Sequence, residues 1–149
     1  MRQIVFIAAM ALAASAGGVG GRADYVGGTS TDFERRVSGR IVTTGVDTLQ
    51  FITKGKAVEI PYDRIHTLEY GQKVDRRYVS AVLLSPLFLM AKSRKHFLTL
   101  GYNDGDGRAQ ALIFQIDKSD VRAVLASLEA RTGRKVAFQD EEARKAGKG

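Results

Sequence analysis

Short runs in which apolar and polar residues alternate, separated by turns, constrain this chain more than any other feature. Such alternation over about four to eight residues predicts a β-strand with one buried face. The runs recur across residues 36–116, and residues 103–107 (NDGDG) supply the Asn, Asp and Gly that a hairpin turn requires. The apolar positions include Ile41, Leu49, Phe51, Val58, Ile60, Ile65, Leu68, Tyr70, Leu98, Leu100, Tyr102, Leu112, Phe114 and Ile116. The pattern predicts about six or seven antiparallel strands that form a sandwich or barrel.

A single helix is predicted after the strands. Its apolar residues are Val121, Val124, Leu125 and Leu128. Their i, i+3, i+4, i+7 spacing places them on one side of a helix. Ser119 suits the N-cap, and Gly133 suits the left-handed position that ends many helices. Because the helix has one apolar stripe, we expect it to cover the open end or an edge of the β structure.

This order of strands followed by one helix resembles the pleckstrin-homology-like superfold. Residues 57–65 (AVEIPYDRI) are similar to a strand-ending phrase of its GRAM and bacterial short forms, and residues 96–102 and 109–116 resemble its late strands. The chain is also similar to bacterial envelope proteins that share its residues 68–72 (LEYGQ), 95–98 (KHFL) and 131–133 (RTG). The resemblance implies a mainly β domain over residues 35–138, with an antiparallel barrel or sandwich closed by one C-terminal helix. Residues 43–47 lack the basic pattern of phosphoinositide-binding members, so specific binding of inositol phosphates is not implied.

Residues 1–16 have the layout of a secretory signal peptide. Arg2 gives a positive start, residues 4–14 form an apolar run, and residues 14–16 (ASA) fit a signal-peptidase site. The run is too short to span a hydrocarbon core as a helix, which needs about 20 residues. We therefore expect cleavage after Ala16 and export to the periplasm or the exterior, peripheral to a membrane, with an uncleaved anchor as the alternative.

The segments on either side of the predicted domain have no apolar periodicity. Residues 17–34 are rich in glycine and predict a flexible linker, and residues 139–149 predict a charged tail. The chain has no cysteine, which excludes disulfides, a lipid-modified N-terminus and thiolate chemistry. Its formal charge of +7, in an exported protein, favours anionic lipid, a surface polymer or an acidic partner over nucleic acid.

Residues 78–91 (YVSAVLLSPLFLMA) depart from the alternating pattern, since eleven of the fourteen are apolar and basic residues lie on both sides. Three interpretations remain open: a buried core element, a loop that enters a membrane interface, or part of a groove for a partner protein. In the membrane interpretation each flanking cation contributes about 1 kcal/mol, and each buried large apolar side chain contributes about 1.5–3 kcal/mol. The predicted binding residues are Lys73, Arg76, Arg77, Leu87, Phe88, Leu89, Lys92, Arg94 and Lys95.

The sequence contains no recognisable catalytic or metal-binding motif. His66 and His96 are the only histidines and lack zinc-site spacing, and the surroundings of Asp104 and Asp106 do not fit an EF-hand. We therefore predict no metal, no cofactor and no catalytic residue.

The preferred function is a non-catalytic binding module whose partner is an anionic membrane surface or an envelope protein. The oligomeric state is not predicted. One alternative is a small hydrolase with a site assembled from distant residues, for which His66, Asp63 and Tyr62 are the first candidates. Another is peptide binding by strand addition at an exposed sheet edge.

Overall fold

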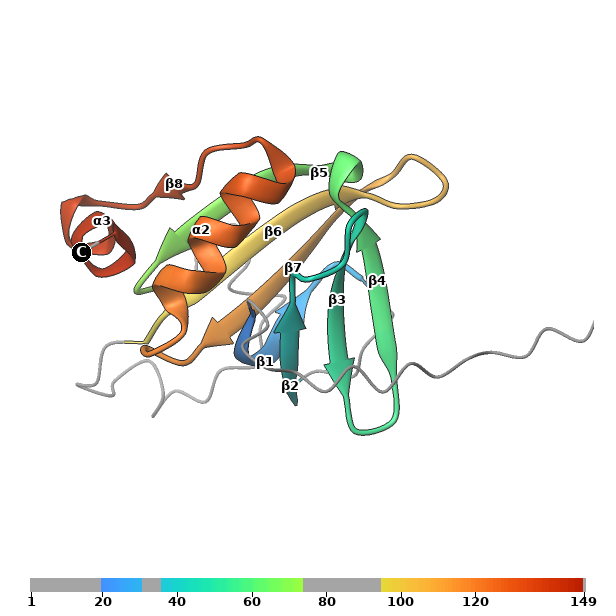
Figure 1. The fold of residues 1–149 in the computed structure, drawn as a ribbon, viewed down its shortest axis with the longest axis horizontal. Coiled ribbons are helices and arrows are strands. Elements are labelled where there is room, and N and C mark those ends of the chain that lie inside the picture. Colours follow the sequence, from blue (N-terminus) through green and yellow to red (C-terminus); the bar gives the residue numbers. More distant parts are fainter. Residues whose placement is uncertain (1–19, 31–35, 74–94, 149) are drawn as a thin grey trace, which may run out of the picture.

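The computed structural model describes residues 20–30, 36–73 and 95–148 and has a mainly β fold (Figure 1). The strands are β1 (Gly20–Gly28), β2 (Val37–Val42), β3 (Thr48–Thr53), β4 (Ala57–Pro61), β5 (Ile65–Gly71), β6 (Phe97–Asn103), β7 (Ala109–Ile116) and β8 (Ala137–Phe138). The helices are the short 3-10 helix η1 (Tyr62–Arg64), α2 (Val121–Thr132) and α3 (Glu141–Lys148). The strands form one eight-stranded sheet in the order β4-β3-β2-β1-β7-β6-β5-β8.

The sheet is mixed and open. Neighbouring strands are antiparallel except β5 and β8, which are parallel. β4 and β8 therefore lie at the two edges of the described sheet. The structure confirms a mainly β fold, but it confirms neither the predicted barrel nor the predicted number of strands.

β1 lies at the centre of this sheet, between β2 and β7, within the segment predicted to be a flexible linker. Ala23, Tyr25 and Val26 are buried there, so the linker prediction is wrong for Gly20–Gly28. Glycine at both ends of the strand hides the alternation in the sequence. Gly21 is needed for packing, because a Cβ at that position would lie 2.5 Å from the Cβ of Asp120, just before α2.

The hydrophobic core lies between one face of the sheet and α2, which crosses that face in Figure 1. All four residues of the predicted helical stripe are buried. Gly133 has the expected left-handed conformation (φ 68°), and its N–H donates to the Glu129 carbonyl. Ser119 is not the N-cap. Asp120 occupies that position, and its carboxylate accepts a 2.9 Å hydrogen bond from the Arg22 N–H of β1.

The segment predicted to be a charged tail contains the helix α3, so that prediction is also wrong. Ala143 and Gly147 are buried, and a Cβ at Gly147 would lie 2.6 Å from the Phe138 ring and 3.0 Å from Leu125. The core therefore extends from Ala23 to Ala143, beyond both limits of the predicted domain. Only small residues of α3 face the core, and for this reason the sequence shows no long apolar stripe here.

Candidate functional site

Two of the nine predicted binding residues, Lys73 and Lys95, are described in the structure. Lys73 follows β5, and Lys95 lies shortly before β6. Gly71 pairs with Phe97 in the antiparallel β5–β6 ladder, so the two lysines lie at the same end of the sheet. The other seven predicted residues lie outside the described residues, as does the apolar segment 78–91. They are Arg76, Arg77, Leu87, Phe88, Leu89, Lys92 and Arg94.

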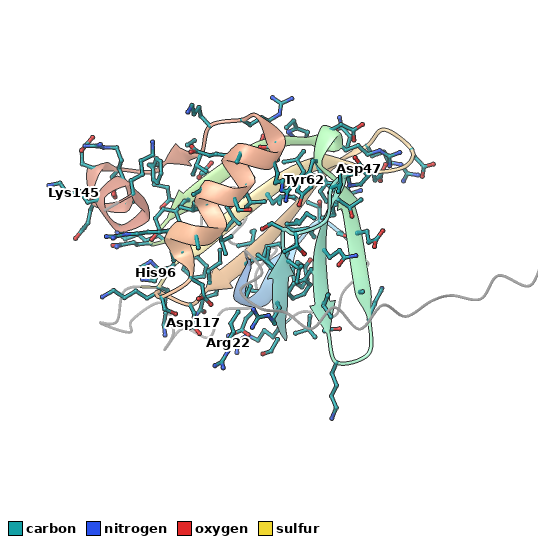
Figure 2. All side chains as sticks on the ribbon, in the orientation of Figure 1. Arg22, Asp47, Tyr62, His96, Asp117 and Lys145 are labelled. Carbon is teal, nitrogen blue, oxygen red and sulfur yellow. The ribbon has the colours of Figure 1, made fainter. Side chains whose placement is uncertain are left out.

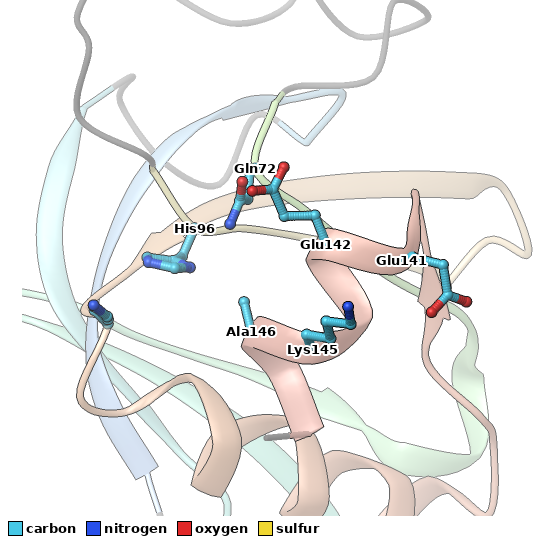
Figure 3. A pocket seen from close by; sticks show the side chains of 7 residues that line it. Gln72, His96, Glu141, Glu142, Lys145 and Ala146 are labelled. Atoms are coloured by element: carbon cyan, nitrogen blue, oxygen red, sulfur yellow. The ribbon is translucent and has the colours of Figure 1, made fainter.

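An open pocket of about 980 Å³ lies at this end of the sheet (Figure 3). Four parts of the chain form it: the residue after β5, the residue before β6, the loop after β7, and α3. The lining residues are Gln72, His96, Lys118, Glu141, Glu142, Lys145 and Ala146. We refer to it as the His96 pocket.

His96 is the most buried polar side chain of this lining, with 7% of its surface exposed. Its Nδ1 shares a 2.5 Å hydrogen bond with the Tyr70 hydroxyl, and the two rings stack with an interplanar angle of 10°. Burial, followed by the nearby Lys118 charge, lowers the pKa of His96. Burial raises the pKa of Tyr70 to about 12. Both side chains are therefore neutral near pH 7.

The hydrogen bond between these rings fixes the tautomer of His96. If His96 Nδ1 donated, the phenolic hydrogen of buried Tyr70 would lack an acceptor among the described residues, which is unfavourable. We therefore assign Tyr70 as the donor and His96 Nδ1 as the acceptor. The remaining nitrogen of His96, Nε2, then carries a hydrogen, so the residue lines the pocket with a neutral N–H donor.

The charged groups of the His96 pocket are of both signs, but one of its carboxylates is already neutralised. Arg144 forms a 2.8 Å ion pair with Glu141, and its hydrogen bonds and charge lower the pKa of that carboxyl group. Lys118 and Lys145 contribute ammonium groups, and Glu142 lies on the rim beside Gln72 (Figure 3). The lining of the pocket thus contains several hydrogen-bond donors.

A second pocket, of about 520 Å³, lies near the C-terminal end of α2, away from the His96 pocket. Figure 2 places Tyr62 and Asp47 there, whereas His96, Asp117 and Lys145 lie toward the start of the helix. Its lining residues are Val46, Asp47, Thr48, Pro61, Tyr62, Asp63, Arg131 and Thr132. We refer to it as the Tyr62 pocket. Tyr62 is 5% exposed, and its hydroxyl makes no hydrogen bond with the described residues. Burial raises its pKa, and the Arg131 charge opposes that shift.

The three residues considered for a hydrolase do not form a hydrogen-bonded set. His66 Nδ1 bonds to the Thr67 hydroxyl at 2.8 Å on the exposed side of β5. Asp63 is exposed in η1, and Tyr62 is buried against the second pocket. The arrangement thus gives no support to a nucleophile–base pair at these positions.

The edge strand β4 is poorly suited to strand addition. It has no neighbour on its outer side among the described strands. Pro61 lacks the N–H that an added strand would need, and Glu59 carries a charge, engaged by the Gln50 side chain at 2.6 Å. Proline and charged residues at an edge disfavour pairing with another chain.

The described residues, 20–30, 36–73 and 95–148, show neither a membrane-spanning helix nor a cluster of metal ligands. Within these ranges no helix has the length and apolar character needed to cross a membrane. In the same part of the chain, no group of three or more His, Cys, Asp or Glu residues is placed to hold a metal ion.

Sequence reasoning missed most of the His96 pocket. It named Lys73 and Lys95 beside the pocket and ended the predicted binding segment at His96, but it included none of His96, Tyr70 and Lys118 among the site residues. A signal was present, since His96 directly precedes β6 and is in phase with the buried residues Leu98, Leu100 and Tyr102. In comparisons with known proteins, the chain matches no protein-family model and no curated protein sequence.

Proposed function

We propose that the protein is an exported, non-catalytic binding module that docks on an anionic membrane surface through residues 73–96. The distribution of charge carries this proposal. Residues 73–96 contain six basic residues and one acidic residue, a surplus of five in a chain whose formal charge is +7. The same stretch contains the apolar run 78–91, so charge and apolar character coincide.

The position of Lys73 and Lys95 supports the proposal. Lys73 follows β5 and Lys95 precedes β6, and these two strands are neighbours, so both lysines lie at the same end of the sheet. A surplus of five cations is worth about 5 kcal/mol at an anionic surface, and the apolar side chains add to this. Binding of this kind is reversible and weakens with salt.

The described side chains favour binding over catalysis. His96 bonds to a tyrosine and His66 to a threonine, so among the described residues neither imidazole is hydrogen-bonded to a carboxylate. A general base in a hydrolase is usually oriented by such a group.

The pleckstrin-homology-like relationship is part of the same proposal. Its support is the element order, in which β1 to β7 are followed by α2. In this view β8 and α3 are additions after the closing helix. Because one superfold serves many functions, the relationship does not by itself identify the partner.

The test is co-sedimentation of the chain without residues 1–16 with neutral and anionic vesicles, at low and high salt. We expect binding to anionic vesicles only, reduced by salt. Lys73→Gln with Lys95→Gln should remove about 2 kcal/mol, roughly a thirtyfold loss of affinity. The matched control is Lys54→Gln with Lys56→Gln in the exposed β3–β4 turn, which changes the net charge equally.

A second variant tests the apolar run. Leu87→Asp with Phe88→Asp should abolish vesicle binding and leave the thermal unfolding midpoint unchanged. Unfolding of this variant would assign the run to the core. Equal losses from both lysine pairs, or no binding to any vesicle, would contradict the proposal and direct the search to an envelope protein.

A further inference from the structure

We propose that the His96 pocket binds a single phosphate monoester group, held by the His96 Nε2–H, the Gln72 amide and the ammonium groups of Lys118 and Lys145. The inference rests on the proposed function, because it names the chemical group that the pocket would take at an anionic surface. The same chemistry is found in a lipid headgroup and in a free phosphate, and the experiment below separates the two.

Tyr70 determines which nitrogen of His96 can donate to a ligand. Tyr70 occupies Nδ1 of His96, so Nε2 is the ring nitrogen that remains for a ligand. The imidazole is buried, stacked and hydrogen-bonded, which fixes its position before any ligand arrives. A donor held in place in this way loses little conformational entropy on binding.

The charges of the lining favour an anionic ligand. Lys118 and Lys145 supply two positive charges and Glu142 one negative charge, while Glu141 is paired with Arg144. A phosphate monoester carries a charge of about −1.5 to −2 at pH 7, and it has several acceptor oxygens. Because the lining is positive overall, it attracts the more highly charged monoester more strongly than a phosphodiester with one negative charge, and a carboxylate has fewer acceptors.

One group of the lining, the Glu142 carboxylate, opposes an anion. Glu142 lies on the rim beside Gln72 (Figure 3), and its carboxylate repels a phosphate. Removing this charge should therefore strengthen binding. This expectation has the opposite sign to that for the lysines, so the pair of substitutions tests for a specific site.

The size of the pocket indicates what kind of molecule carries the phosphate. The pocket, at about 980 Å³, is far larger than a phosphate ion, and it is open to solvent. It therefore accommodates a phosphate carried on a larger molecule. Its walls include Gln72 and His96, the immediate neighbours of Lys73 and Lys95, so a headgroup in the pocket would lie beside the proposed docking residues.

The experiment is a titration of the chain without residues 1–16 with inorganic phosphate and with glycerol 3-phosphate. Calorimetry gives Kd, and the NMR signals of the His96 imidazole report contact at the pocket. We expect a shift of the His96 Nε2–H signal on binding. Lys118→Gln with Lys145→Gln should weaken binding at least about tenfold. Glu142→Gln should strengthen it, and the control Lys54→Gln with Lys56→Gln should leave it unchanged.

Vesicles of matched surface charge separate the sources of the phosphate. Preference for phosphatidic acid, a monoester, over phosphatidylglycerol, a diester, identifies a lipid headgroup as the ligand. Binding of soluble phosphate without binding to any vesicle supports this inference and contradicts the proposed function. Equal binding to both vesicle types, with no response of His96 to phosphate, overturns this inference and leaves the proposed function intact.

Discussion

The pockets near the two ends of α2 each contain a buried tyrosine, and the two hydroxyls differ in their surroundings. In the His96 pocket the Tyr70 hydroxyl has a partner in His96 Nδ1. In the Tyr62 pocket the Tyr62 hydroxyl has no hydrogen bond with the described residues. A buried polar group without a partner costs about 1–3 kcal/mol, whereas a paired one can orient its neighbour. The comparison indicates that the first phenol orients His96 and that the second is a cost to stability.

The largest effect is expected from removing the paired hydroxyl. Tyr70→Phe should lower the free energy of unfolding by about 1–3 kcal/mol, because it leaves His96 Nδ1 buried without its donor. Denaturant unfolding measures this change. The NMR signals of His96 should also show a mixture of tautomers, which a purely structural role of Tyr70 would not produce. An unchanged unfolding free energy would contradict the assigned hydrogen bond.

The second-largest effect is expected in the pH dependence of stability, to which His96 contributes. The pKa of His96 is lowered in the folded state, so the unfolded chain binds more protons below about pH 6.5. The contribution of His96 is therefore complete above pH 6.5 and is lost as the pH falls toward the lowered pKa. His96→Gln should remove this part of the slope in a series of unfolding curves. A slope that persists unchanged in this variant would assign the effect to other groups.

The smallest effect is expected at the unpartnered hydroxyl. Tyr62→Phe removes a buried polar group and keeps the ring, so the free energy of unfolding should stay within about 0.5 kcal/mol or increase. Denaturant unfolding beside Tyr70→Phe gives the direct contrast. A loss of more than about 1 kcal/mol would mean that Tyr62 is paired in solution, and the difference between the two pockets would disappear.

The parts of the fold that could be predicted from sequence are those with conventional side-chain patterns. β3, β4, β6 and β7 show alternation, and α2 shows its stripe of Val121, Val124, Leu125 and Leu128. The core-facing residues are large and apolar, so their spacing could be read directly. In β6 and β7 the intervening residues Phe97, Thr99 and Ile113 are buried as well, so the alternation does not mark an exposed face there.

β1 and α3 could not be predicted, because glycine and alanine interrupt or replace the large apolar residues that define a pattern. β1 carries glycine at four of its nine positions, and glycine usually weakens a strand. α3 has Ala143 and Gly147 toward the core among charged residues, a pattern that also describes a solvated tail. In both cases burial depends on a neighbour, such as Phe138 beside Gly147, that lies elsewhere in the chain.

The candidate site was predictable only in its flanking charges. Lys73 and Lys95 could be named because they border an unusual apolar run. The His96 pocket needs Lys118 and α3 as well, and only the folded sheet brings these to the start of β6. No spacing rule in the sequence expresses that proximity.

The central position of β1 has a consequence for the order in which the sheet is completed. β2 to β4 form one set of neighbouring strands and β5 to β7 form another, and β1 is the described strand that joins them. On one side it pairs with β2, which follows it closely; on the other, Ala23 lies opposite Ile116 of β7. Pairings within a set join residues at most 37 positions apart, as between Ile65 and Tyr102, whereas the union of the two sets pairs Ala23 with Ile116, 93 positions apart. Contacts between residues far apart in sequence form late in folding. The two halves therefore become one sheet only after β7 has been synthesised and has paired with β1.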